Sequence, residues 1–456
     1  MLVYTRLGLF GACLLLALGS HPSSAQTRLP EGTHPRIVVT FANEPLPPLR
    51  PAGSTGRSYA GGTYGLAQRA QEQARQISTR YALRQVASWP IKPLAVHCVV
   101  YEIPDARSVT TLLQTLSHDP HVGIVQSLQE FHTLTAAAKP ADTAAAQPAD
   151  AYNDPLYGLQ SNLVELGIAA AHTRAQGAGV RIGLIDTGVD AGHPDLHERI
   201  SLQRSFVSQN QAPSWFRHGT AMAGLIAAVA NNNVGIVGIA PRAEIAVFQA
   251  CWQLKPDADD AACNTFTLAQ ALTAAIEARL PLVNLSLAGP ADPLLTALVN
   301  AGLKQGTIFV GATAAQADSF PTNIPGVIGV AASEHQQAGA SLLAPAAHVL
   351  TLRPASQYDF ESGSSVAAAE VTALIALLLG ESPHLNATAV LGFLSGGQLP
   401  AAATGGQTGA PVEQPAAAGG QTAASVERPA TVDINGALAR LEASRSAGRV
   451  AATNAR

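Results

Sequence analysis

The chain has 456 residues, of which 47% are hydrophobic and 13% are charged, and its net charge is −4. This length predicts two or three folding units, and the apolar content is enough for a large core, so neither a disordered chain nor a small disulfide-stapled fold is indicated. The low net charge gives no electrostatic reason to expect nucleic acid or an anionic membrane as a partner.

The N-terminus has the pattern of an export signal. Arg6 precedes an apolar stretch from Leu7 to Leu18, and small residues lead to a cleavage site at Ala25. We therefore expect a signal peptide over 1–25, export to the periplasm or the extracellular space, and no transmembrane segment after its removal. Cys13 lies inside the apolar stretch, so we interpret it as part of the removed segment and not as a lipid anchor.

The next part of the chain changes composition twice. Residues 26–78 are rich in Pro, Gly, Arg and Gln without sustained periodicity, which predicts a poorly structured segment. Over 79–132, "LAVHCVVYEIP" and "VGIVQSLQEFHTL" have the patterns of strands and "RSVTTLLQTLSHDP" that of a helix, which predicts a small α+β unit. The Ala/Pro/Asp tract over 133–152 cannot bury a core and is expected to be an exposed linker.

Residues 153–395 alternate between strand-like and helix-like stretches. Two stretches, "TLAQALTAAIEA" and "LLTALVNAGLKQG", have helical length and spacing. Short apolar runs predict buried strands: "VRIGLID", "EIAVFQAC", "PLVNLSL", "TIFVGA", "GVIGVAA" and "HVLTL". Together they predict an α/β fold with a doubly wound, mostly parallel sheet, whose functional residues gather at the carboxyl ends of the strands.

The end of the chain contains a low-complexity tract. Residues 396–430 carry "GGQ" three times and are expected to form a flexible insertion. The amphipathic "VDINGALARL" after it predicts a C-terminal helix within 431–456, followed by a tail.

Three cysteines remain after removal of the signal. In an oxidising compartment, the close pair Cys251 and Cys263 can form a disulfide across "CWQLKPDADDAAC", the alternative being two independent thiols. Cys98 lies in a different region. A metal site is disfavoured here because no second Cys/His pair stands near by.

Three polar residues are expected at one edge of the predicted sheet. Asp186 ends the strand "VRIGLID", His218 starts the Ala-rich helix "HGTAMAGLIAAVA", and Ser365 enters the apolar helix after "ESGS". Taken singly, each of these residues can be explained as a turn or helix-capping residue without a catalytic role. Together, in this chain order, they have the residue types needed for acyl transfer by serine, histidine and aspartate, in the order found in subtilisin.

The sequence resembles the subtilisin-like serine peptidases over about residues 155–395. The resemblance rests on "IDTGVDAGHPDL", "HGTAMAG", "GIVGIAP", "NLSLAGP" and "SGSSVAA". It implies that Asp186, His218 and Ser365 form the catalytic triad, with Ser364 where the family usually has Thr. It also implies that 26–132 are a propeptide with a ferredoxin-like domain, which inhibits the enzyme until it is cut away.

The same resemblance implies a strand that pairs with an extended peptide substrate. The residues that match this strand are Ser286, Leu287, Ala288 and Gly289. Such pairing adds the substrate as a further strand through backbone hydrogen bonds.

The chain departs from the family where a side chain normally stabilises the oxyanion. Ala315 stands at the position of an Asn donor, so the backbone N–H of Ser365 would remain, with Gln316 or Thr313 as replacement donors and Asn323 as a poorer one. Loss of such a donor in subtilisin lowers kcat about 10²- to 10³-fold.

Two further departures follow the expected nucleophile. Ala369 replaces a usual Pro, and Glu370 replaces a common His. They put catalytic efficiency in doubt more than family membership.

A structural calcium ion is a further implication of the resemblance. Asp195 and an Asn-rich loop, with Asn232 or Asn231 as ligand, occupy the corresponding places, and their oxygen atoms suit Ca²⁺. The alternative is a plain turn. No cofactor is expected for catalysis itself.

Two functions remain open. One is an exported endopeptidase that is made as a zymogen and acts on peptide or protein substrates. The other is a pseudopeptidase that binds peptides with an impaired oxyanion hole. The retained triad favours the first, and Ala315 favours the second.

Overall fold

The computed structural model describes most of the chain after the predicted signal peptide, which itself lies outside the described residues. The described ranges are 34–43, 62–137, 151–208, 215–255, 260–316, 318–334, 339–396 and 429–454. Most of the predicted insertion over 396–430 is therefore not described.

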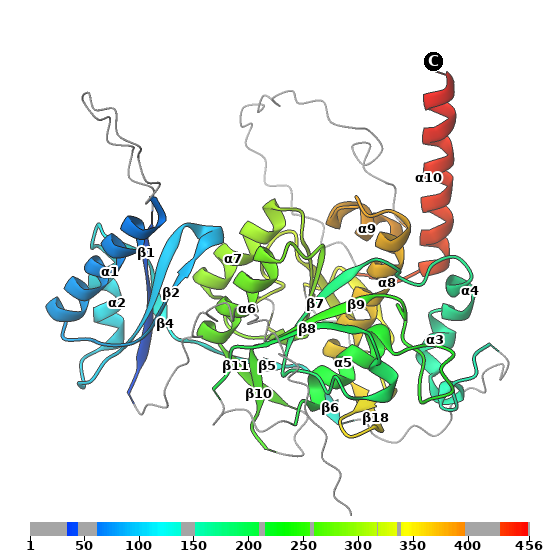
Figure 1. Ribbon diagram of the computed structural model, residues 1–456, viewed down its shortest axis with the longest axis horizontal. Helices are drawn as coiled ribbons and strands as arrows, with labels where there is room; N and C mark the ends of the chain where they lie inside the picture. The colour runs from blue at the N-terminus through cyan, green and yellow to red at the C-terminus, as the bar shows by residue number, and fades with distance from the viewer. Residues whose placement is uncertain are drawn as a thin grey trace, which may run out of the picture.

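A large parallel sheet forms the centre of the molecule (Figure 1). All neighbouring strands in it run parallel. Its eight strands, in spatial order, are β19 (Ala430–Thr431), β16 (Leu342–Ala344), β15 (Ile328–Ala332), β14 (Ile308–Ala312), β12 (Leu282–Leu285), β7 (Arg181–Asp186), β9 (Glu244–Gln249) and β8 (Ile200–Ser205).

Helices cover both faces of this sheet. Helices α5 (Arg217–Ala227) and α8 (Ser364–Glu381) pack on one face, and α6 (Thr265–Glu277) and α7 (Pro293–Lys304) on the other. Side chains alternate along each strand, so Leu184 of β7 joins the first core and Ile185 the second. This confirms the predicted doubly wound α/β fold.

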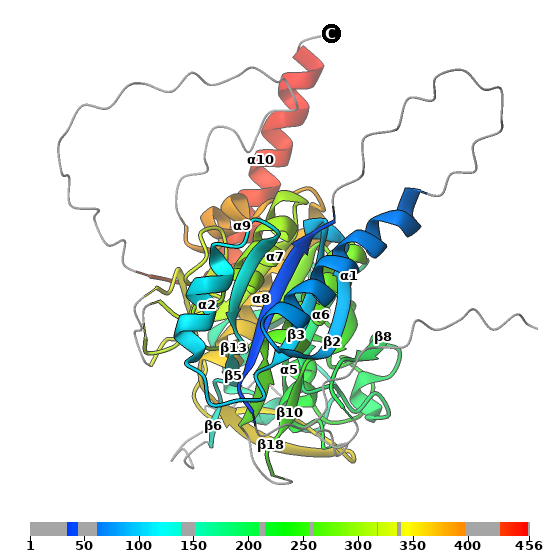
Figure 2. The ribbon, with the colours of Figure 1, turned by 90° about the vertical axis from the view of Figure 1, so that its left-hand side faces the viewer.

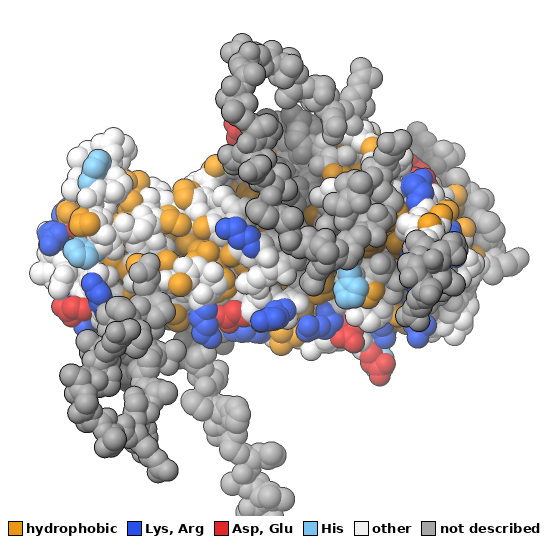
Figure 3. All heavy atoms as spheres, turned by 90° about the horizontal axis from the view of Figure 1, so that it is seen from above, with side chains coloured by type: hydrophobic (Ala, Val, Ile, Leu, Met, Phe, Trp, Pro, Cys, Tyr) orange, Lys and Arg blue, Asp and Glu red, His pale blue; other side chains and the backbone are white. Residues whose placement is uncertain are grey.

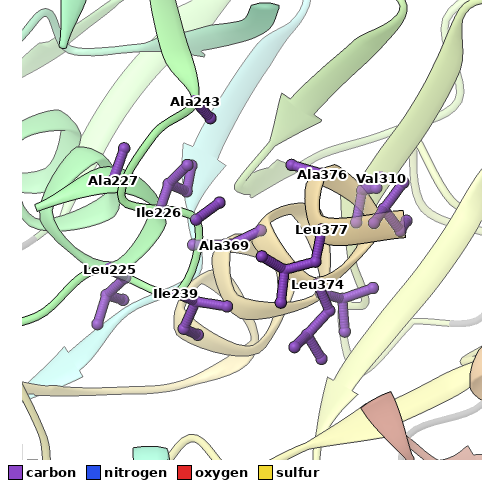
Figure 4. Close-up of a cluster of buried hydrophobic side chains, with 14 of the residues drawn as sticks. Leu225, Ile226, Ala227, Ile239, Ala243, Val310, Ala369, Leu374, Ala376 and Leu377 are labelled. Carbon is purple, nitrogen blue, oxygen red and sulfur yellow. The ribbon is translucent and has the colours of Figure 1, made fainter. Parts of the chain in front are cut away.

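Helix α8 is apolar on every side because it runs through the centre of the first core. Leu374, Leu377 and Ala369 of α8 belong to the same cluster of buried side chains as Ile226 of α5 and Val310 of β14 (Figure 4). Among the described helices, α8 has the length and hydropathy to cross a membrane, but 89% of it is buried inside the protein. Its hydrophobicity is therefore explained by packing.

A second, smaller domain precedes the large sheet. Its four strands are antiparallel in the order β2 (Arg84–Ile91), β3 (Val96–Glu102), β1 (Arg36–Ala42) and β4 (Val122–Ser127), and α1 (Gly62–Arg80) and α2 (Val109–Ser117) cover one face (Figure 2). The expectation of a poorly structured 26–78 is wrong for β1 and α1. Helix α1 was missed because, over the part of it whose side chains are described, the buried apolar residues are Ala70, Ala74 and Ile77 in a Gln- and Arg-rich sequence.

The other face of the small sheet packs on α6 and α7. The Trp89 ring meets the Phe266 ring edge to face at 4.8 Å, and Cys98 is buried in the same cluster. At the edge of this interface, Gln126 donates a 2.6 Å hydrogen bond to the buried carboxylate of Asp292. The two domains therefore share one continuous apolar core.

Two short sheets lie beside the large one. The first is ordered β10 (Cys251–Gln253), β11 (Ala261–Asn264), β5 (Glu130–Thr133) and β13 (Leu287–Ala288), and the second β17 (Val349–Arg353), β18 (Gln357–Ser362) and β6 (Ala136–Ala137). The run "HVLTL" was expected in the parallel sheet, but as β17 it pairs antiparallel with β18 and packs against α5. An apolar run specifies burial but not the strand with which it pairs.

The predicted linker over 133–152 is also wrong at its start. Thr133 belongs to β5, and Ala136 and Ala137 form β6, so this stretch is bound along the large domain. The rest of the linker up to residue 150 lies outside the described part of the chain.

The remaining elements complete the periphery. They are the helices α3 (Ser161–Glu165), α4 (Ile168–His172), α9 (Ala387–Leu394) and α10 (Ile434–Asn454), and the 3₁₀ turns Lys92–Leu94, Tyr157–Leu159 and Pro194–Leu196. Helix α10 agrees with the predicted C-terminal helix. On the face seen in Figure 3, basic and acidic side chains are interspersed.

Candidate active site

Asp186 and His218 meet at the carboxyl edge of the parallel sheet. Asp186 is the last residue of β7, and His218 is the second residue of α5. His218 Nδ1 lies 2.8 and 2.9 Å from the two carboxylate oxygens, and both side chains are fully buried. Burial opposes protonation of His218, but the charge of Asp186 and its hydrogen bond outweigh burial, and the pKa of His218 is raised above its usual value.

A glycine allows this approach. A Cβ atom at Gly219 would lie 2.0 Å from the carbonyl oxygen of Gly188, in the turn that follows β7. The backbone N–H of Gly219 also donates to Thr187 Oγ1 at 3.0 Å. Helix α5 can therefore begin directly against this turn, which places His218 beside Asp186.

Ser365 lies at the start of α8, as predicted, and is fully buried. Its hydroxyl donates to the carbonyl oxygen of Ser286 at 2.9 Å and accepts a hydrogen bond from the backbone N–H of Leu134 at 3.0 Å. His218 Nε2 is buried without a hydrogen-bond partner among the described residues. The structure thus joins the acid and the imidazole, but the hydroxyl of Ser365 donates to Ser286, at the start of the predicted substrate-binding strand, and not to His218.

The predicted substrate-binding strand is occupied by the chain itself. Leu287 pairs with Thr133 and Ala288 with His132, both antiparallel. The Ser286 carbonyl accepts from Ser365, and Gly289 forms a bridge with Phe320 instead of pairing with the bound segment. Leu287 and Ala288 therefore behave as an edge that takes up an extended peptide.

Sequence reasoning missed the segment that fills this edge. The run "VGIVQSLQEFHTL" was predicted to be one strand, whereas the structure divides it into β4 of the small domain and β5, which pairs with β13. Strand β5 also pairs antiparallel with β11 on its other side. The only signal in the sequence was that the strand pattern continued up to the proposed linker.

The expected oxyanion donors border a cavity of about 510 Å³ next to Leu134. Ala315 and Gln316 line it, and both are exposed. Thr313 lines the same cavity, is buried, and its hydroxyl has no hydrogen-bond partner within the described ranges. Of the replacement donors considered, Thr313 is thus the buried one, whereas Asn323 does not line this cavity.

The two substitutions after Ser365 lie in the core. Ala369 and Glu370 are both fully buried in α8. Glu370 Oε1 accepts a 2.7 Å hydrogen bond from Asn162, and its Oε2 has no partner in the part of the chain that is described. Burial raises the pKa of Glu370 well above its usual value, and the nearby Glu165 and Glu334 raise it further.

The proposed calcium ligands do not have the geometry of a calcium site. Asp195 accepts hydrogen bonds from Ile236 N–H at 2.9 Å, from the Asn232 side-chain amide at 3.0 Å and from the Tyr358 hydroxyl at 3.4 Å. Asn231, the alternative ligand, accepts one from a backbone N–H through its side chain. Since Ca²⁺ needs six to eight oxygen ligands, a carboxylate surrounded by N–H and O–H donors does not fit it.

Burial raises the pKa of Asp195 to about 6. The hydrogen bonds from Ile236 and Asn232 oppose this shift, and the charge of Asp154 adds to it. The described residues contain no cluster of three or more His, Cys, Asp or Glu side chains suited to a metal ion.

The predicted disulfide is present. Cys251 of β10 and Cys263 of β11 are bonded, twelve residues apart in the sequence. Because β11 also pairs with β5, the disulfide lies one strand away from the segment that pairs with Leu287 and Ala288. Cys98 is a free, buried thiol in the small domain.

The chain is similar in sequence to known proteins. Residues 177–395 match the model of the subtilase family, Peptidase_S8. The chain is 29% identical over 245 residues to thermitase of Thermoactinomyces vulgaris, covering 50% of this chain and 85% of that protein. It is 30% identical over 295 residues to an alkaline protease of Alkalihalobacillus alcalophilus, covering 59% and 75%.

A solved structure has a similar fold. Fervidolysin from Fervidobacterium pennivorans, described as a keratinolytic enzyme related to subtilisin, superposes with a TM-score of 0.63 at 17% identity. The match covers 89% of this chain and 61% of that one.

Proposed function

Because the chain belongs to the subtilase family and is a serine-type endopeptidase, we propose that it hydrolyses peptide bonds with Ser365 as nucleophile, His218 as general base and Asp186 as the residue that orients the imidazole. The observation that carries this proposal is the buried contact between Asp186 and His218 Nδ1. It leaves Nε2 as the nitrogen available to accept a proton.

The catalytic step requires the Ser365 hydroxyl to exchange one hydrogen bond for another. Its Oγ donates to the Ser286 carbonyl in the structure, and this bond has to be replaced by one to His218 Nε2. Catalytic hydrogen bonds are often long or absent before the reactive complex forms. The developing oxyanion then accepts a hydrogen bond from the backbone N–H of Ser365, which lies at the positive end of the dipole of α8.

We further propose that the protein is exported and made as a zymogen. The export signal, the disulfide and the occupation of the cleft by residues 130–137 support this. The small domain would then act as an intramolecular inhibitor, since it packs on α6 and α7 and delivers the segment that blocks the cleft.

A fluorophosphonate probe, which reacts with activated serines, tests the triad. We expect processed protein to be labelled and Ser365→Ala to lose both labelling and removal of the N-terminal domain. Ser446→Ala, which alters an exposed serine of α10, is the matched control and should behave as wild type.

The second candidate function is a peptide-binding pseudopeptidase. Ala315 favours it, because this side chain lines the cavity at the reacting carbonyl and has no hydrogen-bond donor. Folded, processed protein that binds peptides in the cleft but is not labelled would support this alternative.

A further inference from the structure

Residues 130–137 form an extended chain that pairs with neighbouring strands on both sides of the Leu134–Thr135 peptide bond. Before that bond, β5 is hydrogen-bonded between β11 and β13, with His132 opposite both Ala262 and Ala288. After it, Ala136 pairs with Ser362 of β18. Only Leu134 and Thr135 separate the paired strand β5 from the paired strand β6.

The carbonyl group of Leu134 lies at the interruption. Its oxygen accepts a hydrogen bond from the backbone N–H of Ser365 at 3.3 Å, and the N–H of Leu134 donates to Ser365 Oγ at 3.0 Å. This is the N–H group that would stabilise an oxyanion on Leu134.

Gly363 makes room for this carbonyl. A Cβ atom at Gly363 would lie 2.5 Å from the oxygen of Leu134 and 3.3 Å from Cα of Thr135, and its φ of +123° is one that residues with side chains rarely adopt. Glycine at position 363 therefore allows the backbone of residues 134 and 135 to lie directly against the start of α8.

The register of the segment is fixed by its alternating side chains. Phe131 is fully buried, meets the Phe320 ring at 5.5 Å, and fills the space beside Gly289. Thr133 is buried on the same side of the strand and accepts a hydrogen bond from Ala261 N–H, while His132 is half exposed. A slip of one residue would expose Phe131 and bury His132, so the position of Leu134 is strongly specified.

We propose that the enzyme cuts its own chain between Leu134 and Thr135. This rests on the proposed function and adds to it the bond that is broken. Ser365 Oγ would form a bond to the carbonyl carbon of Leu134 while its proton passes to His218. The Leu134–Thr135 C–N bond then breaks as that proton passes to the Thr135 nitrogen, and water hydrolyses the ester to leave a carboxylate on Leu134.

The structure thus corresponds to the uncut precursor. The hydroxyl of Ser365 still bonds to Ser286, and Ala315 supplies no second donor to the Leu134 oxygen. Both features are expected to slow the first cut.

Mass spectrometry of the full chain during maturation tests the proposal. We expect the first Ser365-dependent products to be a fragment ending at Leu134 and one starting at Thr135. Leu134→Asp should slow this cut by about 10²-fold or more, because a carboxylate would face an apolar cavity wall. Thr135→Val, a substitution of similar shape beside the same bond, is the control and should be cut at the same place.

A peptide provides a second measurement that does not depend on folding of the variants. Processed enzyme is given LQEFHTLTAAAKPA, the sequence of residues 128–141, and its Leu134→Asp form. One cut after the Leu of "FHTL" is expected in the first peptide and none in the second.

The outcomes separate the two proposals. Probe labelling together with a first cut at another bond would overturn the Leu134–Thr135 assignment and leave the peptidase function standing. Absence of both labelling and cutting, in the chain and in the peptide, would overturn the proposed function and the cleavage site with it.

Discussion

His218 Nδ1 lies 2.8 Å from Asp186 Oδ1, and both side chains have no exposed surface. In the proposed mechanism, this buried pair holds one ring nitrogen of His218 and leaves the other for proton transfer.

The raised pKa of His218 predicts the pH dependence of activity. Protonated His218 cannot accept a proton from Ser365, so kcat/KM should fall as the pH drops through the raised pKa. Asp186→Asn removes the charge that raises this pKa, so the acid limb should move to lower pH while kcat falls about 10⁴-fold. Initial rates on a peptide substrate across the pH range test this.

The control for that experiment is Asp318→Asn, which alters an exposed carboxylate. It should leave the pH profile unchanged. An acid limb at the same pH in Asp186→Asn and wild type would show that His218 is not the group that titrates.

Ala315→Asn is expected to increase activity. Ala315 borders the cavity at the Leu134 carbonyl, where an amide donor would stabilise the oxyanion. We expect kcat to rise by up to about 10²- to 10³-fold with KM little changed, the reverse of the loss found when such a donor is removed from subtilisin. Ala315→Leu adds volume without a donor and should not increase kcat, and an equal gain in both variants would exclude oxyanion stabilisation as the cause.

Glu370→Gln is expected to stabilise the protein at alkaline pH. Because burial raises the pKa of Glu370, the folded protein retains a proton that the unfolded chain releases above the usual value of 4.5. The stability associated with this proton is present below that pH and is lost as the pH rises. Each unit of the shift corresponds to about 1.4 kcal/mol.

Urea unfolding at a series of pH values measures this effect in a Ser365→Ala background, which prevents self-digestion. The difference in unfolding free energy between Glu370→Gln and its parent should grow from pH 4.5 upward. Glu244→Gln, at an exposed position, should show no such trend. A pH-independent difference for Glu370→Gln would contradict the proposed buried, protonated carboxyl group.

Removal of calcium is expected to leave the Asp195 region intact. The Asp195 carboxylate is already satisfied by Ile236, Asn232 and Tyr358, so no cation is needed there. The Tm of the Ser365→Ala protein should therefore be the same in EGTA and in millimolar Ca²⁺. A higher Tm in Ca²⁺ that disappears in Asp195→Asn would show that this site does bind the ion.

Much of the fold followed from local patterns. Short apolar runs and helical spacing predicted the parallel sheet and the helices α6 and α7, because burial on both faces of a sheet imposes a pattern on each strand. Cys251 and Cys263 were predicted to bond because they are close in sequence, and the structure confirms it. The catalytic roles of Asp186, His218 and Ser365 remain predictions, although the structure brings the first two into contact.

Other features depend on partners that are distant in the sequence. Strand β1 has an apolar strand pattern, "RIVVTFA", but it is short and stands alone in a Pro- and Gly-rich stretch, and helix α1 carries few apolar residues. Each nevertheless completes the core of the small domain. The calcium prediction stays a prediction: sequence places Asp195 near an Asn-rich loop, and only the structure shows that the Asn232 side-chain amide and the Ile236 N–H donate to the carboxylate.

The sequence by itself determined the buried strands and helices at the centre of the large domain, and the types and chain order of Asp186, His218 and Ser365, because those properties follow from residue type and short-range periodicity. Only the tertiary structure decided that residues 130–137 lie across the cleft with the Leu134 carbonyl on the N–H of Ser365. Strand pairing is satisfied equally well by many backbones, and packing of Phe131 and of the small domain selects this one.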